Sequence, residues 1–339
     1  MRKIFFLLFI VGTILNSCTK NRLKVNVSRI HLKIEILRFE QDLFNIDLMR
    51  ISDEIPGLKE KYGDFFTLFN RVINIGQPDS PTYPEYLKAF ITDPVNNQVY
   101  NKLLEVYPDV DEIKEKLTSA FKHYRYYFPE KVTPDVYTFI SGFNNSLIID
   151  STILGIGLDR YLGSDCLFYQ RLGLTQYARS IMNKKKIVSD CMYAWASTEW
   201  KFEDESQGMV PGNNVLNNII YQGKLYYFVK AMMPGEKDEI IMGFSPEELH
   251  WCEMNEQRMW AYLIEHKLLF STDYLVINKL INAGPFTTYF TRESPARAAV
   301  WTGLQIVEKY MRNFPEVTLS DLMENADYQN ILSLSKYNP

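Results

Sequence analysis

Histidine is scarce in this chain of 339 residues, which contains only four. No two of the four lie at the spacing of paired metal ligands; they are His31, His123, His250 and His266. The H-E-x-x-H pattern of many metallopeptidases, whose two histidines lie one helical turn apart and bind zinc, is therefore absent. We expect neither a metal nor another cofactor.

Other patterns that mark enzymes or nucleic-acid-binding proteins are also missing. There is no G-x-S-x-G nucleophile turn and no phosphate-binding loop, and Gly155-Ile156-Gly157 lacks the third glycine of a dinucleotide fingerprint. The formal net charge is −4 and the isoelectric point is near 5.7. Because nucleic acids attract basic surfaces, a chain without a basic stripe is not expected to bind them.

Cysteine is equally sparse, with four residues. If Cys18 is modified, as argued below, an odd number remains and at most one disulfide can form. The others are Cys166, Cys191 and Cys252. Cys191 and Cys252 lie beside apolar helix stripes, so we expect them to be buried free thiols.

A long hydrophobic run is found only at the N-terminus, over residues 4–15, directly after Arg2 and Lys3. It is shorter than a membrane span requires, and a charged start followed by a short apolar run is typical of a signal peptide. The run ends in Leu15-Asn16-Ser17-Cys18, which resembles the lipobox of bacterial lipoproteins. An ordinary secretory signal with an incidental cysteine is the alternative.

The lipobox predicts a signal peptide over residues 1–17 and an acylated Cys18. Acyl chains contribute roughly 0.8 kcal/mol per buried CH₂, so several chains would hold the protein stably on the lipid bilayer. Residues 18–29 are polar and basic, and we interpret them as a short tether to the membrane.

Hydrophobic residues make up 46% of the chain and charged residues 23%, as in ordinary globular proteins. We predict one domain over residues 30–339, with a strand-and-helix half at 30–203 and a helical half at 204–339. Strands are expected at 30–38, 136–142, 147–149 and 153–158, the last three as a meander. Helices are expected at 53–70, 86–90, 98–107, 110–126, 189–200, 224–233, 245–267, after 272 and at 296–313, with a short one in the tail.

The helix over 189–200 is the element around which we expect the fold to be organised. On a 3.6-residue period Val188, Met192 and Trp195 share one stripe, and the next position of that stripe is Glu199. The helix over 245–267 likewise has a single carboxylate, Glu256, on its apolar face. A carboxylate on such a face must find a partner, stay protonated or line a cleft.

Strands, a central helix and a second long helix follow one another here as they do in zincin metallopeptidases. The sequence therefore predicts an α+β, mainly helical fold, with a small mixed β-sheet over the central helix on a zincin-like, degenerate metallopeptidase scaffold. We predict a cleft between the two helices that binds a partner. Its candidate residues are Trp195, Glu199, Glu203, Glu253, Glu256 and Arg297.

Three other interpretations of these residues remain open. The four glutamates could converge as a pair of carboxylates for hydrolysis of a glycan or of peptidoglycan. They could also form a structural network with Arg258 or Arg297. A metal-dependent enzyme with unusual ligands is the third.

Several segments together resemble one family, the gliding-motility lipoprotein GldB of Bacteroidota. They are the lipobox, Asp159-Arg160-Tyr161-Leu162-Gly163, Ile241-Met242-Gly243-Phe244-Ser245, Trp251-Cys252-Glu253-Met254-Asn255-Glu256, Ser271-Thr272-Asp273, Glu293-Ser294-Pro295-Ala296-Arg297 and Trp301-Thr302-Gly303-Leu304-Gln305-Ile306-Val307. The family is itself similar to predicted zinc proteases, whose histidines this chain lacks, so the resemblance carries no activity over.

The resemblance implies a lipoprotein of the cell envelope, associated with gliding or with the linked protein-secretion machinery, or with envelope assembly. We expect it to be anchored in the outer membrane, to face the periplasm and to bind an envelope protein rather than to act as an enzyme. The strand over 153–158 would form the cleft edge, where an extended peptide could add by β-pairing.

Overall fold

The structure is a computed structural model that describes residues 22–202 and 212–339. The predicted signal peptide, the lipidation site Cys18 and the cleft candidate Glu203 lie outside these residues. Within them, no helix is both long and apolar enough to cross a membrane.

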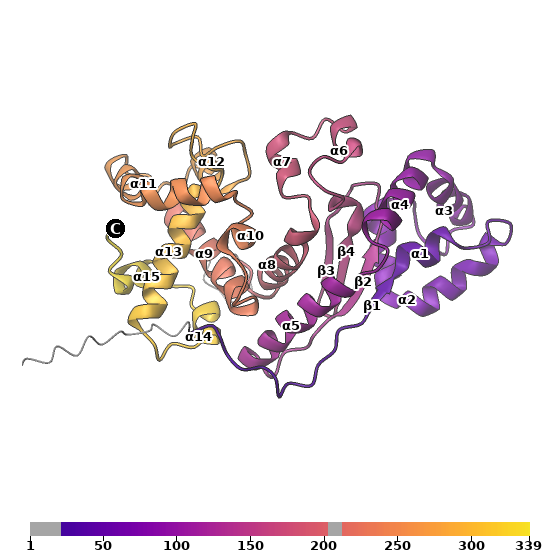
Figure 1. Cartoon of the computed structure of the whole chain (residues 1–339), viewed down its shortest axis with the longest axis horizontal. Coiled ribbons are helices and arrows are strands. Elements are labelled where there is room, and N and C mark those ends of the chain that lie inside the picture. Colours follow the sequence, from indigo (N-terminus) through magenta and orange to yellow (C-terminus); the bar gives the residue numbers. More distant parts are fainter. Residues whose placement is uncertain (1–21, 203–211) are drawn as a thin grey trace, which may run out of the picture.

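The N-terminal part is a short strand followed by five helices, seen at the right and centre of Figure 1. Its core is a cluster of phenylalanines with no exposed surface, among them Phe39, Phe65 and Phe69. The bounds are β1 Ile36–Arg38, α1 Phe39–Phe44, α2 Ile51–Ile73, α3 Tyr83–Thr92, α4 Pro94–Val106 and α5 Asp111–Tyr127. The strand expected over 30–38 is thus confined to its last three residues.

A four-stranded mixed sheet occupies the middle of the molecule, in the order β1-β2-β4-β3. Its remaining strands are β2 Asp135–Phe139, β3 Leu147–Asp150 and β4 Ile153–Gly157. β2 pairs in parallel with both β1 and β4, and only β3 and β4 are antiparallel. The small mixed sheet is confirmed, but the meander is wrong because β2 does not pair with β3.

The order of strands also corrects the predicted cleft edge at 153–158. β4 lies between β2 and β3, and all five of its residues are buried. Its backbone groups are bonded on both sides, so no peptide can add to it. The connection from β2 to β3 turns through Gly142 and Phe143, both at positive φ, and delivers β3 to the outer side of β4.

The two faces of the sheet contribute to different cores, as the alternation of side chains along a strand requires. Tyr137 and Phe139 of β2 pack into the phenylalanine core beside α1–α3. Val136 of β2 and Leu154 of β4 belong to the larger core, which also contains residues of α5, α8 and the C-terminal helices. This larger core spans the predicted boundary between the two halves at residue 203.

The C-terminal part is helical and surrounds one helix, α9, that is buried on nearly all sides. The buried helix expected at 224–233 is confirmed and is longer. The helix expected at 245–267 is α11, and a capping box of Ser245 and Glu248 lies at its start. The bounds are α6 Leu167–Arg171, α7 Gln176–Ser180, α8 Ile187–Glu199, α9 Val215–Met232, α10 Asp238–Met242, α11 Pro246–Glu265, α12 Tyr274–Ile281, α13 Ala298–Asn313, α14 Leu319–Glu324 and α15 Tyr328–Ser335, with 3₁₀ turns at Leu158–Arg160 and Lys184–Lys186.

The tightest helix contact is the crossing of α9 and α13, where two glycines face each other. A Cβ on Gly303 would lie 1.9 Å from the carbonyl oxygen of Ile219, and one on Gly223 would lie 2.5 Å from the backbone of Gly303. Only residues without a side chain let the two backbones approach so closely. This contact fixes α13, whose N-terminal end forms part of the site described next.

Candidate functional site

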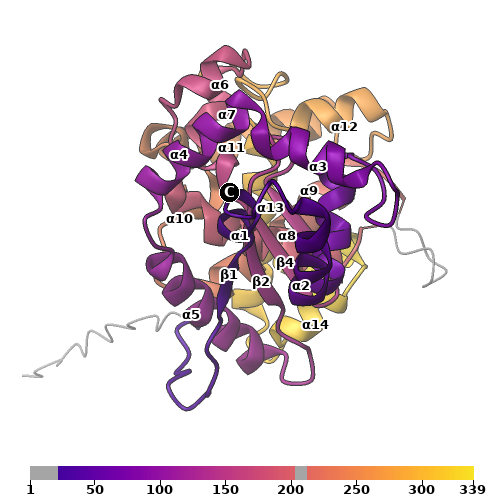
Figure 2. The ribbon, with the colours of Figure 1, turned by 90° about the vertical axis from the view of Figure 1, so that its right-hand side faces the viewer.

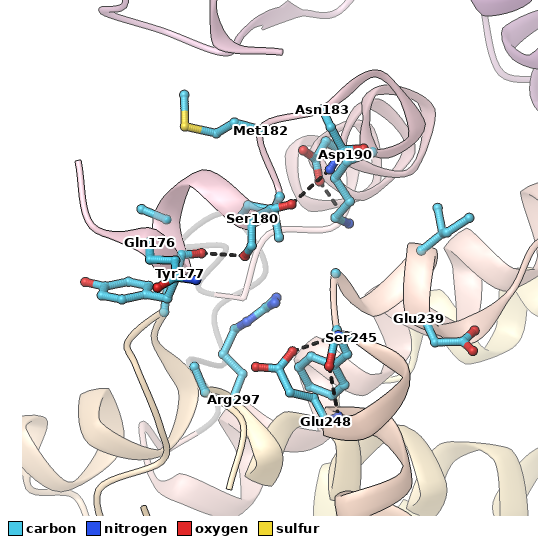
Figure 3. Close-up of a pocket in the computed structure, with 18 of the residues that line it drawn as sticks. Gln176, Tyr177, Ser180, Met182, Asn183, Asp190, Glu239, Ser245, Glu248 and Arg297 are labelled. Carbon is cyan, nitrogen blue, oxygen red and sulfur yellow. Dashed lines mark hydrogen bonds and ion pairs between the residues drawn. The ribbon is translucent and has the colours of Figure 1, made fainter. Parts of the chain in front are cut away.

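A cavity of about 830 Å³ lies between two groups of helices that are far apart in the sequence. One wall is formed by α7, the 3₁₀ turn Lys184–Lys186 and the start of α8, and the other by the end of α10, the start of α11 and the loops before α13 (Figure 3). The view down the other axis, in Figure 2, places α6, α7, α11 and α12 at the upper end of the molecule. In Figure 3 the side chain of Arg297 lies between the two walls, with Ser180 on one side and Glu248 on the other.

Three of the segments on which the family resemblance rests meet in this cavity. Arg160 and Tyr161 come from the turn after β4, Gly243 from the end of α10, and Arg297 from the loop before α13. Gly243 ends α10 with a φ of 70°. A Cβ there would meet Lys186 Cε at 3.0 Å and Arg297 Nη2 at 3.6 Å, so glycine is needed for both the turn and the space.

An ion pair between the buried Lys186 and the half-buried Asp190 lines the cavity. Lys186 Nζ lies 3.0 Å from Asp190 and donates hydrogen bonds to Ser189 Oγ at 2.6 Å and to the carbonyl oxygen of Ile241 at 2.9 Å. The hydroxyl of Tyr161 donates to Asp190 Oδ2 at 3.1 Å. Burial raises the pKa of Tyr161 well above its ordinary value, so the phenol is neutral. These groups bond one another and join α8 to α10.

The carboxylate of Asp159, next to the cavity residue Arg160, is fully buried. Its Oδ2 accepts the backbone N–H groups of Ser141 at 3.0 Å and Phe143 at 2.7 Å. Burial raises the pKa of Asp159 to about 6, although those two hydrogen bonds act in the opposite direction. The carboxylate thereby fixes the turn between β2 and β3, whose Phe143 carbonyl accepts a hydrogen bond from Arg160 Nη1 at 3.2 Å.

Two arginines of the cavity wall, Arg160 and Arg297, are held by hydrogen bonds to uncharged groups. Arg297 has a φ of 61°, and its Nη1 and Nη2 donate to the hydroxyl of Tyr226 at 2.5 Å and to the carbonyl oxygen of Met242 at 2.8 Å. Its guanidinium lies 5.7 Å from the ring centre of Phe244. Arg160 is half-buried, and its Nε has no hydrogen-bond partner among the described residues. Neither forms an ion pair there.

The structure does not bring the predicted cleft residues together. Trp195 is 1% exposed and packs edge-on against Phe121 and Tyr124, so it is a core residue. Glu199 is the last residue of α8 and forms an ion pair with Lys131, away from the cavity. Because α8 ends at Glu199, this position of the apolar stripe lies at the end of the helix and not over the core.

The carboxylates of α11 also have partners elsewhere. Glu256 accepts a hydrogen bond from the hydroxyl of Tyr337 at 2.8 Å, and Glu253 is exposed, 3.9 Å from His250. Of the described cleft candidates, only Arg297 lines the cavity. Throughout residues 22–202 and 212–339, no three His, Cys, Asp or Glu side chains are grouped as ligands of a metal ion.

Sequence reasoning missed the residues that line the cavity opposite Arg297. Lys186 and Asp190 are four residues apart, the spacing at which oppositely charged side chains meet on a helix, and this was the available signal. Nothing in the local sequence places Arg160 and Tyr161 beside this pair, because they come from the turn after β4. The buried free thiols expected at Cys191 and Cys252 are found as predicted.

Comparison with known proteins identifies one family. The family model described as gliding motility protein GldB matches residues 20–339, which is nearly the whole chain. No curated protein and no solved structure gives a significant match.

Proposed function

Since this chain belongs to the family of the gliding motility protein GldB, we propose that it is a lipid-anchored, non-enzymatic protein of the cell envelope that holds part of a partner protein in the cavity. The partner belongs to the gliding or linked secretion machinery, or to envelope assembly. One observation carries this proposal above the others. Segments of the family resemblance that are more than a hundred residues apart line one cavity.

The chemistry of the cavity favours binding over catalysis. Lys186 and Asp190, the ion pair of the cavity lining, are held by Ser189, Tyr161 and a backbone carbonyl. Groups with so many fixed partners hold a wall in place, whereas a general acid or base must be able to reach a substrate proton. The glutamates considered for glycan hydrolysis, Glu199, Glu253 and Glu256, have separate surroundings and do not line the cavity.

The course of α13 supports an orientation in which the cavity is distant from the membrane. Arg297 precedes the first turn of α13, and at the far end Arg22 donates hydrogen bonds to the carbonyl oxygens of Met311 at 2.8 Å and Phe314 at 3.4 Å. A helix of 16 residues is about 24 Å long. Only three residues separate Arg22 from the proposed anchor Cys18, so the bilayer would lie near the end of α13 opposite the cavity.

A partner would therefore reach the cavity from the side away from the anchoring membrane. In Figure 1 the described chain begins at the lower edge, beside α14, whereas α7 and α12 lie at the upper edge. With an anchor in the inner leaflet of the outer membrane, the cavity would open towards the periplasm.

Replacement of Cys18 by serine should release the protein from the membrane. The thioether to the lipid cannot form on serine, and a short basic tether contributes little binding of its own. Labelling cells with radioactive palmitate and fractionating them would check this. Wild type should be labelled and sediment with membranes, and the Cys18→Ser variant should be unlabelled. A palmitate-labelled Cys18→Ser variant would contradict the anchor.

Filling the cavity should abolish partner binding without removing any charge. Ala178 of α7 is half-buried and lines the cavity, and Ala178→Trp places a large side chain there. Ala89→Trp on the exposed side of α3 is the matched control. The measurement is quantitative mass spectrometry of proteins that co-purify with each form from solubilised envelopes. At least one protein should be retained by wild type and Ala89→Trp and lost from Ala178→Trp; an identical set for all three would overturn the proposal.

A further inference from the structure

We propose that the ligand group recognised in this cavity is a carboxylate of a peptide segment, which Arg297 binds while apolar side chains of that segment pack against Tyr177 and Phe244. This inference rests on the proposed function, because it names the chemistry by which a partner protein would be held. Three observations support it. Arg297 forms no ion pair within the described residues, its guanidinium has N–H donors beyond the two that are used, and apolar side chains lie beside it.

The charged side chains of the cavity do not all have partners. Four basic and three acidic side chains line it: Arg160, Lys185, Lys186, Arg297, Asp190, Glu239 and Glu248. Lys186 and Asp190 neutralise each other. Glu248 accepts the backbone N–H of Ser245 at 2.7 Å as part of the capping box of α11. The carboxylate of Glu239 points away from Arg297 in Figure 3.

Arg160, Lys185 and Arg297 form no ion pair within the described residues. The charge of Arg160 acts on the buried carboxylate of its neighbour Asp159, which leaves Arg297 as the half-buried cation of the lining without such a neighbour. A half-buried charge without a counter-ion is more costly than one at the surface, and an anion entering the cavity would compensate it. With four cations and three carboxylates the lining has a formal charge of +1, whereas the chain as a whole has −4.

Arg297 is held in place and has N–H donors available for a ligand. A guanidinium has five N–H donors in a planar fork, and Arg297 uses two of them, one for Tyr226 and one for the carbonyl oxygen of Met242. These two bonds and the ring of Phe244 hold the side chain in place. Figure 3 shows Arg297 extending between α7 and the start of α11, into the middle of the space. A fixed guanidinium with donors still available matches the two oxygens of a carboxylate.

Apolar side chains line the cavity together with Arg297. Tyr177 of α7 is 40% exposed, and Ile181, Phe244 and Pro285 also line the cavity. A free inorganic anion would gain nothing from contact with these apolar side chains. A peptide with an acidic group and neighbouring apolar side chains fits both the guanidinium and the apolar surface. The acidic group is either an Asp or Glu side chain or the carboxylate at a chain end, since both present the same two oxygens.

The test uses peptide libraries and the detergent-solubilised, full-length mature protein. One octapeptide library has Asp or Glu at its centre and the other has Asn or Gln, and each is made with a free and with an amidated C-terminus. The immobilised protein should retain acidic over amide peptides by roughly tenfold or more, the effect of a charge-assisted hydrogen bond. Preference for the free C-terminus alone would identify a chain end as the source of the carboxylate.

Variants locate the preference. Arg297→Gln should reduce retention of the acidic peptides to about the level of the amide peptides, and Arg297→Lys should retain part of it because the charge remains without the fork. Arg292→Gln removes an exposed arginine of the same loop that does not line the cavity, and should leave the preference unchanged. Thermal unfolding of each variant shows whether it is folded; if Arg297→Gln is not, Lys185→Gln at the exposed rim provides the test, with a smaller expected loss.

Three results would overturn the proposal. They are equal retention of acidic and amide peptides with no preference for a free C-terminus, retention of no peptide at all, and loss of bound peptides in millimolar inorganic phosphate, which would indicate a phosphate site. Equal retention that Ala178→Trp abolishes would still support partner binding in the cavity. Failure of the carboxylate inference is thus distinguishable from failure of the proposed function.

Discussion

Gly303→Ala should lower the free energy of unfolding by about 3 kcal/mol or more, the upper range for overpacking a well-packed core. The new Cβ would lie 1.9 Å from the carbonyl oxygen of Ile219, and both atoms belong to buried helices. Backbone cannot rotate away as a side-chain end can, so α9 and α13 must separate. Their separation would open gaps along the whole crossing, because protein interiors are close-packed.

A matched control exists in α2. Gly57 is exposed in that helix, and a Cβ there would meet nothing within 4 Å. Gly57→Ala should therefore stabilise the protein by about 0.4–1 kcal/mol through the unfolded chain and the helix propensity. Urea unfolding of the three proteins measures both effects. A Gly303→Ala variant within about 1 kcal/mol of wild type would contradict the close approach of the two helices.

Asp159→Asn should remove a pH dependence of stability worth about 3 kcal/mol. Burial raises the pKa of Asp159 from 3.8 to about 6, and each pH unit of such a difference corresponds to about 1.36 kcal/mol. Because the folded-state pKa is higher than the unfolded one, the folded protein binds more protons between these values. The contribution is therefore fully present below about pH 4 and is lost as the pH rises through about 6.

The amide of asparagine cannot ionise, so the variant lacks this loss. Its free energy of unfolding, relative to wild type, should rise by about 3 kcal/mol between pH 4 and pH 7. Urea unfolding at each pH gives the difference directly, and comparison with wild type cancels the other titrating groups. Asp150→Asn, at an exposed carboxylate, is the control and should show no such trend. A pH-independent difference for Asp159→Asn would contradict burial of a raised-pKa carboxylate.

The elements that sequence predicts well are those whose signal is local. The capping box of Ser245 and Glu248 gives the start of α11 within one residue, and Gly303 marks the close helix contact. The mainly helical α+β class follows from such signals added together. The zincin-like scaffold and the single domain stay predictions.

The order of the strands could not be predicted, because it depends on long-range pairing. Closely spaced strands favour a meander, but β2 pairs with β1, about a hundred residues earlier, and with β4. Positive φ angles at Gly142 and Phe143 let the chain pass to the far side of β4. The residue Phe143 gives no sign of this, since a bulky residue is uncommon in that conformation.

The residues that line the cavity could not be predicted from the sequence for a related reason. A helical period places Trp195 and Glu199 on one stripe, but it does not say whether that stripe faces a core, a cleft or the helix end. Trp195 faces the core and Glu199 pairs with Lys131 at the end. Arg297 was a candidate for the predicted cleft between the two helices, and it lines a different cavity with Lys186 and Asp190. The cavity is formed by segments that lie far apart in the sequence and close together in the fold.

Site-specific photo-crosslinking in living cells tests most directly whether this cavity receives a partner. A photoreactive phenylalanine replaces Tyr177 on the cavity rim or, as the control, the exposed Tyr86 of α3. The account predicts a discrete adduct of higher mass from position 177, absent from position 86 and lost when Ala178→Trp is added. Adducts of the same mass from both positions, or an adduct from position 177 that survives Ala178→Trp, would contradict it.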